Sequence, residues 1–104
     1  MLILELDSQT ETRFHKLASV HNQNYNELIN SMVNYRIHEL KRGIQNIELD
    51  FVAYESKHKI TSANFYKLYQ NGGFENDCEN NDFMIWSAEY ESYLEFQNEL
   101  KQLL

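Results

Sequence analysis

An apolar stripe at helical spacing runs through the middle of this sequence and constrains the fold more than any other feature. Apolar side chains recur every three or four residues from Tyr25 to Tyr54 without losing phase, which is the pattern of a helix with one buried face. The chain contains no proline, and one glycine such as Gly43 costs only about 1 kcal/mol inside a helix. The sequence therefore predicts one helix from about Tyr25 to Lys57, with a kink at Gly43 as the alternative.

The residues before this helix predict a strand and a further helix. Leu2, Leu4 and Leu6 alternate with other residues, a period of two that is typical of a short strand. A helix over about 9–21 follows, with Asp7 or Ser8 as its cap. A single strand needs a partner along its edges, so a homodimer in which two copies pair their strands is expected. The predicted fold class is mainly α, with a short N-terminal strand and a helical C-terminal extension.

The C-terminal third combines negative charge with aromatic side chains. From Asn71 to Leu104 there are eight acidic residues and one basic residue, whereas residues 1–70 contain eight of each, so the net charge of −7 comes from this segment. A short helix beginning at Thr61 or Ser62 and a last helix beginning at Asn81 or Asp82 are expected. The last helix carries a heptad seam, made of Phe83, Trp86, Tyr90, Tyr93, Gln97, Leu100 and Leu104.

Several classes of protein are not indicated. A single cysteine, Cys78, cannot form an intramolecular disulfide. No apolar run approaches the length of a membrane span, and the first residues lack the features of a signal peptide, so a cytoplasmic protein without membrane contact is expected. The four histidines show no metal-ligand spacing with Cys78. We expect no enzymatic activity, no cofactor and no metal site.

The N-terminal segments Leu2-Ile3-Leu4-Glu5-Leu6, Phe14–Ala18 and Asn24–Val33 resemble the ribbon-helix-helix family of repressors and antitoxins. The resemblance implies a dimerisation and DNA-binding module over residues 1–43. Its dimer contacts would come from Leu2, Leu4, Leu6, Leu28 and Met32. Its DNA contacts would come from Ile3, Glu5, Arg13, Asn24, Tyr25 and Asn26, although operator DNA is expected only as an additional ligand, because these positions offer little positive charge.

The segments Tyr54–Ser62 and Asp82–Leu94 resemble the C-terminal part of small bacterial, especially cyanobacterial, antitoxin-like proteins. The resemblance implies that residues 44–104 bind and neutralise a cognate basic toxin, while the protein regulates its own operon. Aromatic anchors and carboxylates suit such a surface. The expected partner-binding residues are Phe83, Trp86, Glu89, Tyr90, Tyr93, Phe96 and Leu100.

Other interpretations fit the same residues. Trp86 and Phe83 could be buried against Phe51, Tyr54 and Phe65 of their own chain, and the acids could form an ordinary solvated helix face. The alternative functions are a ribbon-helix-helix transcriptional regulator and an acidic inhibitor or adaptor of a nucleic-acid enzyme.

Overall fold

The computed structural model describes residues 5–20, 24–73 and 81–104. All regular secondary structure in these ranges is helical: α1 (Ser8–Val20), α2 (Tyr25–His58), α3 (Ser62–Gln70) and α4 (Asn81–Leu103). The chain forms two compact units, Met1–Arg36 and Ile37–Leu104. The division falls seven residues before the predicted boundary at residue 43, and it lies within α2.

The described residues contain no strand, so the predicted N-terminal strand is not seen. Glu5 and Leu6 adopt no regular structure, and Leu2 and Leu4 lie outside the described residues. A strand is stable only when a neighbour satisfies its edges, and the described segments of this chain contain no second strand. The prediction of a ribbon-helix-helix fold was therefore wrong, and the described protein is all-helical.

Local capping explains where the first two helices begin. The backbone N–H of Thr10 donates to Asp7 Oδ1 at 2.7 Å, and that of Glu27 donates to Asn24 Oδ1 at 3.1 Å. Each acidic or amide side chain thus satisfies one of the N–H groups that a helix start leaves without an intrahelical partner. Glu27 also accepts from Asn24 Nδ2 at 3.3 Å, so the start of α2 is fixed by a reciprocal pair.

The helix α2 is continuous over 34 residues, which confirms the prediction of one helix through Gly43. It ends at His58, where Lys59 takes a φ of 57°. The helix α3 then starts with Thr61 as its N-cap, whose hydroxyl accepts from the N–H of Asn64. The predicted short third helix is therefore confirmed.

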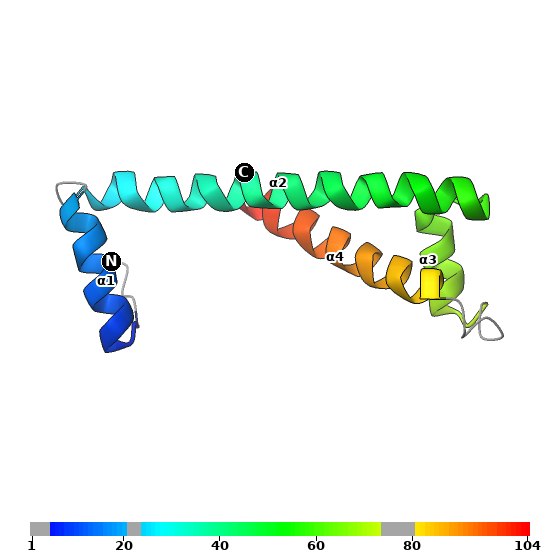
Figure 1. Ribbon diagram of the computed structural model, residues 1–104, viewed down its shortest axis with the longest axis horizontal. Helices are drawn as coiled ribbons and strands as arrows, with labels where there is room; N and C mark the ends of the chain where they lie inside the picture. Colours follow the sequence, from blue (N-terminus) through cyan, green and yellow to red (C-terminus); the bar gives the residue numbers. More distant parts are fainter. Residues whose placement is uncertain (1–4, 21–23, 74–80) are drawn as a thin grey trace. The chain divides into compact units, whose positions relative to one another are not determined.

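The unit Ile37–Leu104 is built around an aromatic core. The helix α4 runs back along the C-terminal half of α2, while α3 links the two (Figure 1). The buried core consists of Ile47, Phe51, Phe65 and Trp86. A ring of half-buried side chains surrounds it, formed by Tyr54, Ile60, Tyr66, Tyr69, Phe83, Tyr90, Tyr93 and Phe96.

Gly43 permits the close approach of α4 to α2. A Cβ atom built on Gly43 would lie 2.9 Å from Cε2 and 3.2 Å from Cδ2 of Phe96, which is closer than carbon atoms pack without strain. The ring of Phe96 occupies the space that any larger residue at position 43 would need. The glycine inside the long helix is thus explained by packing, not by a kink.

Candidate partner-binding surface

The inner face of α4, which packs against α2 and α3, contains the aromatic residues predicted to bind a partner. Trp86 has no exposed surface. Its indole ring stacks on Phe65 with centroids 3.9 Å apart and planes 5° from parallel, and it also stacks on Tyr54 at 5.3 Å. Full burial of such a ring stabilises a small domain by several kcal/mol. In this conformation Trp86 is therefore a core residue and has no surface that a second protein could contact.

The one polar atom of Trp86 is satisfied inside the core. Trp86 Nε1 donates to Ser62 Oγ at 2.9 Å, and the backbone N–H of Ser62 donates to Glu55 Oε2 at 2.7 Å. These bonds connect α4 to the first residue of α3 and connect α3 to α2. Because a buried indole N–H without an acceptor is costly, Ser62 fixes the rotation of α4 about its own axis.

The remaining predicted partner-binding residues are half-buried against the same core. Tyr90 lies 5.7 Å and Tyr93 lies 5.2 Å from Phe51, measured between ring centroids. Leu100 lines a surface hollow of about 400 Å³ together with Ile44 and Leu104. The heptad seam of α4 is therefore largely occupied by contacts within one chain. This agrees with the interpretation that its aromatic residues are buried against their own chain.

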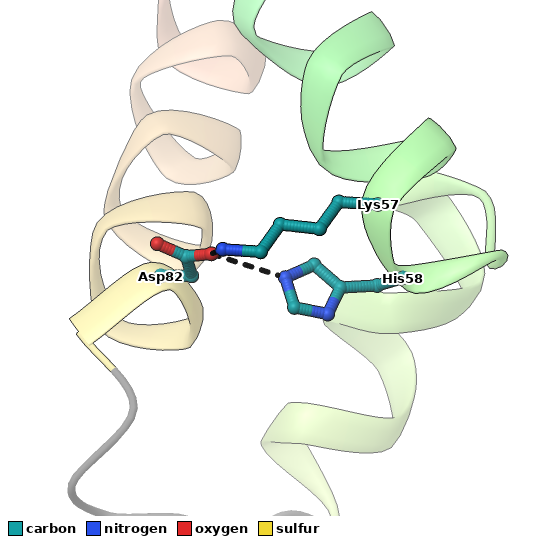
Figure 2. A network of polar contacts seen from close by, with 3 residues as sticks. All are labelled: Lys57, His58 and Asp82. Carbon is teal, nitrogen blue, oxygen red and sulfur yellow. Dashed lines mark hydrogen bonds and ion pairs between the residues drawn. The ribbon is translucent and has the colours of Figure 1, made fainter.

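The first turn of α4 is held to the end of α2 by charge. Lys57 Nζ donates to Asp82 Oδ2 at 2.5 Å, and His58 Nε2 lies 3.2 Å from the same oxygen (Figure 2). The hydrogen bond from Lys57, followed by that from His58, lowers the pKa of Asp82 below its usual value. A carboxylate is also favoured at a helix N-terminus. These contacts fix the position at which α4 starts.

Two acidic residues, Asp50 of α2 and Glu89 of α4, lie against each other. Burial, followed by a side-chain hydrogen bond with Asp50, raises the pKa of Glu89 to about 7. Within the described part of the chain, Glu89 Oε2 is buried and has no hydrogen-bond partner. Two carboxylates in contact cannot both ionise without repulsion, so Glu89 keeps its proton to a higher pH than an exposed glutamate does. Glu89, predicted to face a partner, lies at the edge of the packed face.

The surface of α4 that points away from the core differs in character, and we refer to it as the outer face. Met84 and Ile85 remain 58% and 49% exposed. The outer face consists of Met84, Ile85, Ala88, Glu91 and Glu95, all of them exposed. Its first turn is thus apolar and its next turns are acidic. Glu91 Oε1 also accepts from the hydroxyl of Tyr66 at 3.1 Å, which supports one carboxylate from α3.

Sequence reasoning missed Met84 and Ile85 as candidate binding residues. The sequence did contain a signal for them, because both lie outside the heptad seam. On the solvent side of a helix that packs on a core with one face, polar residues are expected. Leu49 and Val52 give the same signal on α2 and are 70% and 65% exposed. The carboxylates near them are those of Glu48, Asp50 and Glu55. Asp50 lies against Glu89, and Glu55 accepts from the backbone N–H of Ser62, so only Glu48 adds an acid to this surface of α2.

The N-terminal unit places its predicted site residues at the surface. Glu5, Arg13, Asn24, Tyr25 and Asn26 are exposed, and Ile3 lies outside the described residues. Asn24 is engaged in capping α2, and the ring of Tyr25 stacks on Phe14 with centroids 6.0 Å apart.

The predicted dimer contacts are divided between core and surface. Leu28 is buried, Leu6 and Met32 are exposed, and Leu2 and Leu4 lie outside the described residues.

Two kinds of site are absent from the described ranges. No three histidine, cysteine or carboxylate side chains among them come together in a way that could hold a metal ion. None of the described helices combines the length and the apolarity that a bilayer crossing requires.

Comparison with known proteins adds no relative: no family model, no curated protein and no solved structure matches this chain.

Proposed function

We propose that this chain is an antitoxin-like binding protein that covers a basic surface of a partner protein with the outer face of α4. The observation that carries the proposal is the arrangement of that face: two exposed apolar side chains, Met84 and Ile85, precede the carboxylates of Glu91 and Glu95 on one side of a helix. Apolar anchors supply most of the affinity in such an interface, and complementary charge supplies selectivity and speed of association.

The core makes this face suitable for binding because it holds α4 in place. Asp82 fixes the start of the helix, and Trp86 fixes its rotation through Ser62. A surface carried by a rigid element loses less conformational entropy when a partner binds. The inner aromatic face thus contributes indirectly, by presenting the outer one.

The chemistry of the surface favours a basic partner. A net charge of −7, concentrated in the C-terminal third, repels nucleic acid and attracts proteins that bind it. A toxin that cuts or modifies RNA needs a basic groove, and a helix with this face would block it. The proposal places the pair in the cytoplasm, with the partner encoded by the neighbouring reading frame, and it makes this chain a binding protein and not a catalyst.

Co-expression with the product of the neighbouring reading frame tests the proposal. The neighbour alone should arrest growth, and this chain should restore growth and co-purify with the neighbour. The double variant Met84→Ser with Ile85→Ser should lose both effects, because it removes both apolar anchors without touching the core. The matched control, Leu49→Ser with Val52→Ser, removes two comparably exposed apolar side chains from α2 and should retain both effects. A neighbour that is harmless, or that binds both double variants equally well, would contradict the proposal.

A further inference from the structure

The N-terminal unit leaves an apolar stripe open on the first part of α2. Tyr25, Leu28, Met32 and Tyr35 follow one another at spacings of three, four and three residues, which places them on one side of the helix. Leu28 is buried, whereas Met32 and Tyr35 are 52% and 71% exposed. We refer to Tyr25, Met32 and Tyr35 as the open stripe.

The unit is too small to be stable on its own contacts. Among the described residues up to Arg36, only Ala18 and Leu28 are buried apolar residues. Helical segments of fewer than about 40 residues usually need a disulfide, a metal or association to become stable. This chain has no second cysteine to form a disulfide, and the described residues contain no metal-binding group. Association is the remaining route.

The charge distribution favours a second copy of the same chain as the associating molecule. Residues 1–36 carry four acids and three bases, whereas residues 37–104 carry twelve acids and six bases. No carboxylate occurs between Glu27 and Glu39, the segment that contains Met32 and Tyr35. Two copies can therefore meet along the open stripe without the repulsion that their acidic units impose elsewhere. A basic partner gains little there, because the attraction lies in the other unit.

The available area is sufficient for such a contact. The open stripe and the exposed Leu17 and Val20 of α1 together present on the order of 500 Å² of side-chain surface per chain. A symmetric pair that covered all of it would bury about 1,000 Å², the lower limit for a specific interface. Helices joined by short connections commonly complete their core by pairing with a second copy in a four-helix arrangement. We infer that the N-terminal unit is a self-association module in which the open stripes of two copies pack against each other.

Sedimentation equilibrium on the full chain tests this inference. At concentrations on the order of 10 μM, the protein should have twice the 12.5 kDa mass of one chain, and its Tm should rise with concentration because folding is linked to association. Met32→Glu with Tyr35→Glu should reduce the mass to that of one chain while circular dichroism shows the helix content of the C-terminal unit retained. The control, Leu49→Glu with Val52→Glu, adds the same charge at comparably exposed positions and should remain dimeric.

The outcomes separate this inference from the proposed function. Met84→Ser with Ile85→Ser should leave the mass doubled even where it abolishes partner binding. A monomeric wild-type chain with a concentration-independent Tm would overturn the inference. The inference would also be overturned if the dimer dissociated after the changes at Leu49 and Val52, or at Met84 and Ile85, but not after the changes on the open stripe.

Discussion

Replacing Gly43 by alanine tests whether α4 packs on α2 as closely as the structure indicates. In a helix interior, alanine is more favourable than glycine by about 1 kcal/mol. At this position the new Cβ would lie 2.9 Å and 3.2 Å from two ring atoms of Phe96, and forcing an extra carbon into a packed interface costs about 1–3 kcal/mol. The clash outweighs the gain in helix propensity, so Gly43→Ala should lower the free energy of unfolding by about 1 kcal/mol.

Shortening the ring at position 96 should reverse the sign of this effect. Phe96→Leu removes the ring atom that lies nearest to the new Cβ, so Gly43→Ala added to this variant should raise the free energy of unfolding by about 0.5–1 kcal/mol. The coupling between the two positions would then be roughly 2 kcal/mol, within the range measured for residues in contact. Urea unfolding followed by far-UV circular dichroism gives all four values, provided that the slope m is unchanged.

A control position separates helix propensity from packing. Asn46 is exposed on α2, and Asn46→Ala should raise stability by the propensity difference alone, with or without Phe96→Leu. If Gly43→Ala stabilised the wild-type chain as much as it stabilises the Phe96→Leu chain, then α4 would not approach α2 at this point, and the described packing of the two helices would be refuted.

Four further substitutions test the contacts that hold α4. Trp86→Ala should destabilise the chain by about 3–5 kcal/mol. Ser62→Ala should destabilise it by about 1–3 kcal/mol, because the indole N–H loses its acceptor. Both are measured by urea unfolding, and neutral effects would mean that Trp86 is not in the core. The pKa of Glu89 is raised to about 7 in the folded chain, so stability should fall as the pH rises from about 4.5 to 7 and then level off. Glu89→Gln should remove this slope and, after allowance for solvent screening, stabilise the chain at pH 8 by about 1 kcal/mol. Glu95→Gln on the outer face is the control. Equal slopes in the wild-type and Glu89→Gln chains would contradict the contact between Asp50 and Glu89. The pKa of Asp82 is lowered, so its stabilising effect is present above its ordinary pKa and disappears as the pH falls through the lowered value; Asp82→Asn should reduce Tm at pH 7 in low salt, and a Tm unchanged by the substitution would show that the contacts with α2 contribute nothing.

The helices could be predicted from the sequence because their signals are local. The stripe from Tyr25 to Tyr54, the cap at Thr61 and the seam starting at Phe83 each depend on neighbours in the same segment. Such patterns indicate which side of a helix is buried. The alternation over residues 2–6 predicted a strand that the described residues do not contain, because a period of two over so short a segment does not require one.

The candidate site could be predicted only in part, because a seam does not reveal what covers it. The spacing of Phe83, Trp86 and Tyr90 is the same whether α2 of the same chain or another protein packs on it. The contact of Gly43 with Phe96, and the pairing of Asp50 with Glu89, join positions that are far apart in the sequence. A single sequence contains no signal for such pairs.

The affinity for the basic partner, measured by titration with three forms of this chain, tests the central claim most directly. The claim is that α4 binds through its outer face while its inner face stays in the core. Met84→Ser with Ile85→Ser should weaken binding by about 10- to 100-fold, as expected for the loss of two anchoring side chains, while Leu49→Ser with Val52→Ser should bind like the wild-type chain. Equal affinity of all three forms, or binding that requires Trp86 to leave its contact with Phe65, would contradict it.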